Sequence, residues 1–115
     1  MSTETSAATR RYRRISLPQG MLIAWYGGGE QRVSRVQTLG MGGLFVAEPN
    51  APRVGTSLRL SFEVPGGSVH MEAVVRNVTP GHGMGVEFVK LNTRDRVLME
   101  MLLRRLLREI PGQSA

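Results

Sequence analysis

The sequence predicts a mainly β protein, with six short strands that close into a small antiparallel barrel or sandwich, followed by a C-terminal helix. Three observations predict this class. Short apolar runs are separated by turn residues along most of the chain, several runs alternate apolar with polar side chains, and the apolar period lengthens near the C-terminus. A chain of 115 residues fits one domain with a single core.

The first three strands are separated by glycine and proline. We expect them at residues 21–26, 32–38 and 43–47. Glycine groups follow the first two runs, and a segment with two prolines follows the third. Glycine and proline are the strongest interruptions of regular structure, so each group predicts a turn.

The next three strands give the clearest signal. In residues 57–64 every second side chain is apolar, and the same period recurs in residues 69–76 and 84–89. A period of two predicts a strand with one buried face. Pro65-Gly66-Gly67-Ser68 predicts a hairpin between the first two of these strands, and residues 79–83 predict another turn.

Residues 93–110 are predicted to form an amphipathic helix that lies against the strands and closes one open end. Asn92 or Thr93 can cap its start, and Pro111-Gly112 ends it. Its main apolar face comprises Met99, Leu102, Leu103, Leu106 and Ile110. Three apolar residues outside this face either lie under loops or form a homodimer contact through the helix: Val97, Leu98 and Met101.

Composition excludes several classes of protein. The chain has no cysteine, so it has no disulfide, thiolate zinc site or cysteine nucleophile. His70 and His82 are isolated and are expected on the surface, and Asp95 is expected in the first turn of the helix. The glycine groups match neither a P-loop nor a dinucleotide fingerprint. We therefore expect no enzyme, no metal and no cofactor.

No segment approaches the roughly 18 apolar residues that a membrane span requires. Residues 1–9 lack the apolar region of a signal peptide. We therefore expect a cytoplasmic protein without membrane insertion, in which residues 1–9 and 111–115 are flexible tails.

The positive charge is concentrated near the N-terminus. The chain has a formal net charge of +6, and Lys90 is its only lysine. Four arginines fall within five positions: Arg10, Arg11, Arg13 and Arg14. Their planar guanidinium groups suit phosphates and the edge of guanine, and Tyr12 and Trp25 are available for stacking. A solvated basic tail that aids solubility is the alternative interpretation.

The order of these features resembles the PilZ domain family. An RxxxR motif at Arg10 and Arg14 precedes six strands, a GxGVEF segment at residues 83–88, and the amphipathic helix. PilZ domains are bacterial receptors for cyclic di-GMP, built as a six-stranded antiparallel β-barrel with a C-terminal helix. The resemblance implies one domain over residues 10–110, with the barrel at about 20–90. It also implies that Arg10 and Arg14, beside Arg11 and Arg13, bind the phosphates and guanines of the ligand.

The second motif of the family, D/N-x-S-x-x-G, falls on residues 38–43 and is only partly kept. Thr38 replaces the acid or amide, Gly40 replaces the serine, and Gly43 retains the glycine. A threonine hydroxyl lacks the two acceptor oxygens that a carboxylate offers to guanine N–H groups. Gly40 offers only its backbone.

The resemblance implies a cyclic di-GMP receptor that relays the level of the second messenger to an unidentified effector protein, in motility, pilus or exopolysaccharide control. An alternative is a degenerate PilZ-like adaptor that acts by protein contacts without the nucleotide. A small basic barrel that binds RNA or single-stranded DNA is the weakest reading. Such surfaces interleave aromatic and basic residues, whereas aromatics make up 5% of this chain and Phe62 and Phe88 are expected to face inward.

Overall fold

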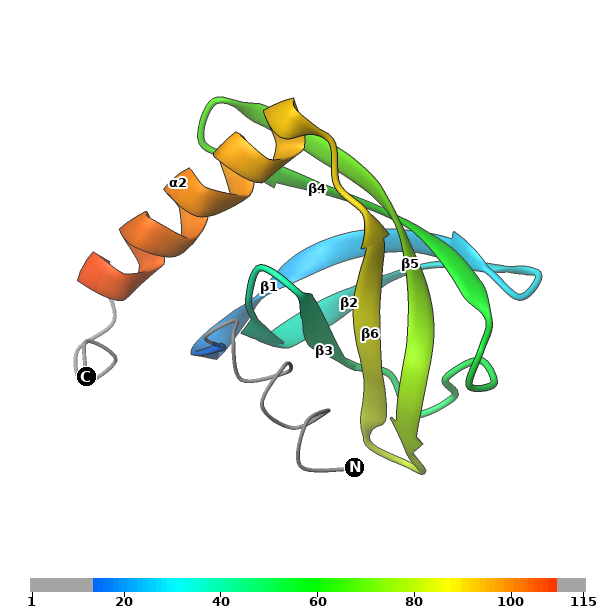
Figure 1. Ribbon diagram of the computed structural model, residues 1–115. Coiled ribbons are helices and arrows are strands. Elements are labelled where there is room, and N and C mark those ends of the chain that lie inside the picture. The colour runs from blue at the N-terminus through cyan, green and yellow to red at the C-terminus, as the bar shows by residue number, and fades with distance from the viewer. Residues whose placement is uncertain (1–13, 110–115) are drawn as a thin grey trace, which may run out of the picture.

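The computed structural model describes residues 14–109, a closed six-stranded antiparallel barrel and one helix (Figure 1). The elements are β1 (Ile15–Gly27), β2 (Glu30–Leu39), β3 (Gly43–Ala47), β4 (Ser57–Val64), β5 (Gly67–Thr79), β6 (Gly83–Lys90) and α2 (Thr93–Glu109). The order around the barrel is β1-β2-β3-β6-β5-β4. The predicted tails at residues 1–9 and 111–115 lie outside the described residues.

The six predicted strands are all present, and two of them match the predicted bounds. β3 and β4 span residues 43–47 and 57–64, as expected. β1 is longer than the predicted run, because it begins at Ile15 rather than near residue 20. Ile15 and Leu17 are buried, so the core extends along the earlier part of this strand.

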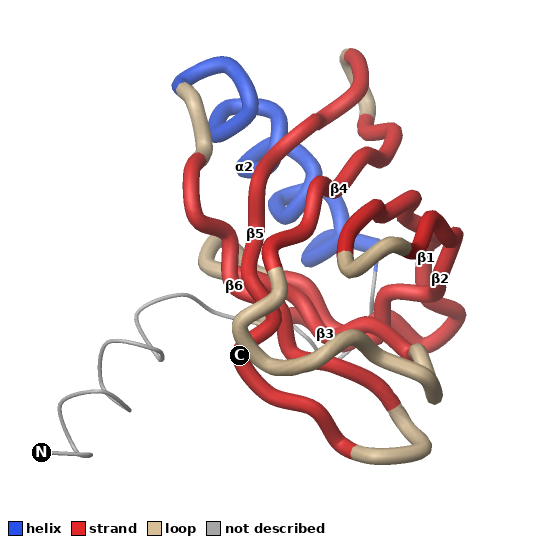
Figure 2. Tube along the Cα trace, turned by 90° about the vertical axis from the view of Figure 1, so that its right-hand side faces the viewer, coloured by secondary structure: helices blue, strands red, loops and turns tan. Residues whose placement is uncertain are grey.

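The strand registers define two ends of the barrel. The start of β1, the β2–β3 loop, the β4–β5 turn and the end of β6 lie at one end, where α2 begins; we call this the helix end. The β1–β2 turn, residues 48–56 and the β5–β6 turn lie at the opposite end, which we call the far end. Figure 2 shows the strands curving around the barrel and α2 beside it.

The core is one cluster of side chains contributed by all six strands and by α2. In β4 the predicted alternation is confirmed, because Leu58, Leu60, Phe62 and Val64 are all buried. Each such side chain contributes roughly 1.5–3 kcal/mol relative to the exposed state. The barrel closes between β1 and β4, which pair over Ala24–Tyr26 and Arg59–Ser61.

The helix packs against β1, β4 and β5 and so covers one end of the barrel, as predicted. The side-chain amide oxygen of Asn92 accepts a hydrogen bond of 2.7 Å from the backbone N–H of Asp95, so Asn92 is the N-cap. Leu98 is buried and lies under the β4–β5 turn, against Gly66. Val97 and Met101 remain exposed. Among the described residues, no helix is long and apolar enough to cross a membrane.

Candidate functional site

Two of the predicted ligand residues meet at the helix end of the barrel. Arg14 directly precedes β1, and the pairing of Ser16 with Thr38 brings it beside β2. The Arg14 guanidinium Nη1 donates a hydrogen bond of 3.4 Å to the Thr38 hydroxyl. Arg14 and Thr38 are 24 positions apart in sequence, so one residue of each motif meets the other in space. Tyr12 and three of the predicted ligand residues lie outside the described residues: Arg10, Arg11 and Arg13.

The Arg14 guanidinium is a cation without a counter-charge in the described part of the chain. Its hydrogen-bond partner there, Thr38, is neutral, and no carboxylate lies within ion-pair distance. Desolvation by neighbouring atoms lowers the pKa of Arg14 from its ordinary value. Such a shift means that the surroundings disfavour the charged form. Arginine nevertheless stays protonated at neutral pH, so the site is suited to an anion.

An irregularity in the pairing of β2 with β3 turns Thr38 toward the outside of the barrel. Between β2 and β3, the register passes from Val36 opposite Val46 to Thr38 opposite Phe45, which leaves Gln37 as an extra residue. An extra residue of this kind reverses the alternation of faces that follows it. Val36 and Leu39 are therefore both buried, while Gln37 is exposed and Thr38 is half-buried.

The β2–β3 loop is held by backbone hydrogen bonds. The Gly40 N–H donates to the Gly43 carbonyl at 2.9 Å, and the Phe88 N–H donates to the Gly42 carbonyl at 3.0 Å. A Cβ atom on Gly43 would lie 2.1 Å from the Val86 carbonyl oxygen, so the approach of β3 to β6 alone requires glycine at this position. Gly40 is buried and can offer only backbone groups. Of the three predicted positions in the second motif, Gly40 and Gly43 have no side chain, so only Thr38 can offer a side-chain group.

A buried polar network inside the barrel was not predicted from the sequence. Glu48 directly follows β3, and it is buried like Leu44 and Val46, the alternate residues of that strand. Its side chain accepts hydrogen bonds from Ser34 at 3.0 Å and from Arg32 at 2.7 Å. Ser34 in turn accepts a bond of 2.9 Å from the Trp25 indole N–H. Trp25 is only 1% exposed, so the expectation that it is available for stacking is wrong.

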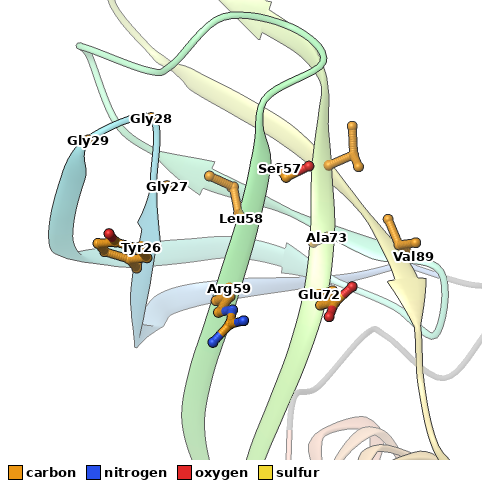
Figure 3. Close-up of a pocket in the computed structure, with 11 residues that line it drawn as sticks. Tyr26, Gly27, Gly28, Gly29, Ser57, Leu58, Arg59, Glu72, Ala73 and Val89 are labelled. Carbon is orange, nitrogen blue, oxygen red and sulfur yellow. The ribbon is translucent and has the colours of Figure 1, made fainter.

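A surface hollow of about 470 Å³ lies beside the β1–β2 turn and extends across β4 and β5 toward the end of β6 (Figure 3). Tyr26, Arg59, Glu72 and Val89 help to line it. Arg59 stands directly opposite Glu72 across β4 and β5, so the local charges are balanced. The hollow and the candidate site lie at opposite ends of β1. Tyr26, which lines the hollow, is near the last residue of this strand, whereas Arg14 directly precedes its first residue.

His70 and His82 are exposed, as predicted. Across residues 14–109, no three His, Cys, Asp or Glu side chains are grouped to hold a metal ion.

Solved structures show that the fold recurs in other proteins. The inhibitor of motility of Bacillus subtilis (MotI/DgrA) matches with a TM-score of 0.71 and 22% identity over 87% of this chain and 52% of its own, so the chain spans about half the length of that protein. The PilZ domain of CeSA from a cellulose-synthesizing bacterium matches with a TM-score of 0.64 and 17% identity, over 82% of this chain and 97% of its own. The PilZ domain of YcgR from Escherichia coli, solved with c-di-GMP, matches with a TM-score of 0.60 and 17% identity, over 87% of this chain and 95% of its own.

The sequence comparison agrees with the fold. No curated protein sequence matches the chain. The family model of the PilZ domain matches residues 8–109, which include both predicted motifs, all six strands and the helix. The six-stranded barrel, its C-terminal helix and the convergence of Arg14 with Thr38 fit this match. The chain belongs to the PilZ domain family.

Proposed function

We propose that this protein is a receptor for cyclic di-GMP, without catalytic activity of its own, which relays the level of this second messenger to a partner protein. One observation carries the proposal: the last arginine of the RxxxR motif, Arg14, lies beside Thr38 of the second motif at one end of the barrel. Membership of the PilZ family and the likeness to a PilZ domain solved with c-di-GMP support the same ligand.

The chemistry of the site suits a cyclic dinucleotide. Guanidinium groups donate paired hydrogen bonds to phosphate oxygens and to the O6 and N7 atoms of guanine. In our proposal Arg10 and Arg14 make these contacts, and Arg11 and Arg13 add positive charge. The Thr38 hydroxyl and the backbone of the β2–β3 loop contribute neutral hydrogen bonds. Each charge-assisted bond that Thr38 and Gly40 fail to provide weakens binding by roughly 1.5–3 kcal/mol.

The position of the site suggests how a signal is passed on. The ligand would lie where β1 begins and where β2 turns into β3, so it would join these two parts of the barrel into a new surface. The partner recognises this surface in our proposal. The similar fold of an inhibitor of motility makes a component of motility control one candidate partner, beside pilus and exopolysaccharide control.

Isothermal titration calorimetry with cyclic di-GMP tests the proposal. The Arg10→Ala, Arg14→Ala double variant is expected to bind at least about a hundredfold more weakly than the natural sequence, since it loses two charge-assisted contacts. Its melting temperature is expected to stay nearly unchanged, because Arg14 is exposed and its hydrogen bond to Thr38 is long. The matched control is Arg53→Ala, Arg59→Ala, which removes equal charge at the far end and should leave the affinity within about twofold. Equal affinity in the Arg10, Arg14 double variant would contradict the proposal.

A second candidate function is an adaptor that acts by protein contacts without the nucleotide. Thr38 and Gly40, in place of the acid or amide and the serine, favour it. The exposed Val97 and Met101 on α2 offer an apolar contact for a partner or for a second copy of the chain. No heat of binding at about 1 mM cyclic di-GMP would favour this adaptor, because even a complex of about −4 kcal/mol would be half formed there.

A further inference from the structure

Arg35 on β2 differs from the other arginines of the described strands because it has no neighbouring carboxylate among the described residues. Arg32 binds Glu30 and Glu48, and Arg76 binds Glu87. The remaining strand arginine outside β2, Arg59, lies directly across from Glu72. Three of the four strand arginines therefore have a carboxylate as a bonded or cross-strand neighbour, and Arg35 has none.

The cross-strand neighbours of Arg35 are uncharged on both sides. Leu22 lies opposite it on β1 and Ala47 lies opposite it on β3. Opposite charges placed across a sheet stabilise it by roughly 0.2–1 kcal/mol, and Arg35 gains no such contribution. Because Arg35 is exposed and has no carboxylate partner among the described residues, its guanidinium is free to bind an external anion.

The stem of Arg35 is held in one direction by a bulge in β1. Four residues of β1, 17–20, lie between the positions paired with Thr38 and Val36. The last of them, Gly20, has φ of +72°, and a Cβ atom there would lie 2.3 Å from the Arg35 Cγ and 2.6 Å from its Cδ. The absence of a side chain on Gly20 therefore provides the space that the Arg35 stem occupies.

This packing points Arg35 toward the candidate site. Gly20 lies nearer to the helix end than Leu22, the residue directly opposite Arg35, so the Arg35 stem leans toward that end. The extra residue Gln37 places Thr38 on the same outer face as Arg35. The two residues are three positions apart, about 10 Å along the strand. Arg14 and Arg35 thus approach the outer surface around Thr38 from its two sides.

We propose that Arg35 is a further ligand-binding residue, outside both motifs, whose guanidinium binds a phosphodiester group of the cyclic dinucleotide. The inference rests on the proposed function, and it adds a third described group to Arg14 and Thr38. A guanidinium–phosphate contact is charge-assisted and often bidentate. Arg35 would therefore supply binding energy that Thr38 and Gly40 do not provide.

The test is a cyclic di-GMP titration of the natural sequence and of Arg35→Gln, Arg35→Lys and Arg53→Gln. Glutamine keeps the Cγ and Cδ atoms that pack on Gly20 and removes the charge, so Arg35→Gln should fold with an unchanged melting temperature. We expect its Kd to rise at least about tenfold. Arg35→Lys should fall between Arg35→Gln and the natural sequence, because lysine keeps the charge but lacks the planar fork. Arg53→Gln removes the same charge at the far end and should bind within about twofold of the natural sequence.

The outcomes separate this inference from the proposed function. Strong binding by the natural sequence with an unchanged Kd in Arg35→Gln would overturn the role of Arg35 and leave the receptor proposal standing. Equal weakening in Arg35→Gln and Arg53→Gln would also overturn it, since the effect would then reflect net charge alone. If the natural sequence binds no cyclic di-GMP, both proposals fall together.

Discussion

Glu48 shows how one buried carboxylate can organise the interior of a small barrel. It is 6% exposed, and its two oxygens accept bonds from Ser34, from Arg32 and from the backbone N–H of Asn50. Through Ser34 the network also satisfies the Trp25 indole N–H. Among the described residues, no buried side-chain nitrogen or oxygen lacks a partner. A fully satisfied network of this kind fixes the packing around it, whereas a broken one is costly.

Replacing Glu48 should therefore destabilise the protein strongly. Glu48→Ala leaves Arg32 without its closest carboxylate and Ser34 without an acceptor, and we expect the free energy of unfolding to fall by about 2–4 kcal/mol. Urea denaturation followed by Trp25 fluorescence measures this change. The control Glu63→Ala removes an exposed carboxylate that binds Ser68 and should change stability by less than about 1 kcal/mol. A loss below about 1 kcal/mol in Glu48→Ala would show that the network contributes little.

The roles of some of these residues could be predicted from the sequence, and the roles of others could not. Arg14 and Thr38 could be predicted because each belongs to a recognisable motif. Trp25 could not be placed, because residues 21–26 are almost uniformly apolar and do not show which face is buried. Glu48 sits beside Pro49 in a segment that reads as a loop, and only the closed barrel shows that it continues the inner face of β3.

At the scale of the elements, the positions of the strands were easier to predict than their register. The Pro65-Gly66 turn fixes the β4–β5 hairpin, which continues without interruption from Ser57 to Val64. The irregularities near Gln37 have no comparable signal, because they depend on how β2 fits two neighbours at once. These irregularities place Thr38 and Arg35 on one face, so the geometry of the candidate site could not be predicted from the sequence.

The helix offers a direct test of its packing against the barrel. Met99 is fully buried, whereas Met101, two positions later, is 48% exposed. Met99→Ala should lower the free energy of unfolding by about 2–5 kcal/mol through the cavity that it leaves. Met101→Ala should change it by less than about 0.5 kcal/mol, since it alters a surface position of the same helix. Equal losses in the two variants, measured by urea denaturation, would contradict the observed orientation of α2.

At the scale of the whole molecule, the closed barrel divides structural from proposed binding roles between its two ends. The interior network and the balanced charges around Arg59 lie toward the far end. Arg14, Thr38 and the β2–β3 loop gather at the helix end. In our proposal, a cyclic dinucleotide bound there changes the surface around the β2–β3 loop without altering the core.

The most direct test of this account locates the ligand on the protein. In a titration of isotope-labelled protein with cyclic di-GMP followed by NMR, the amide signals of Thr38, Gly40 and Gly43 should shift in a saturable manner. The signals of Gly29 and Gly81, in the turns at the far end, should not move. Saturable shifts confined to the far end would contradict the proposed site. The absence of any shift at about 1 mM ligand would contradict the receptor itself.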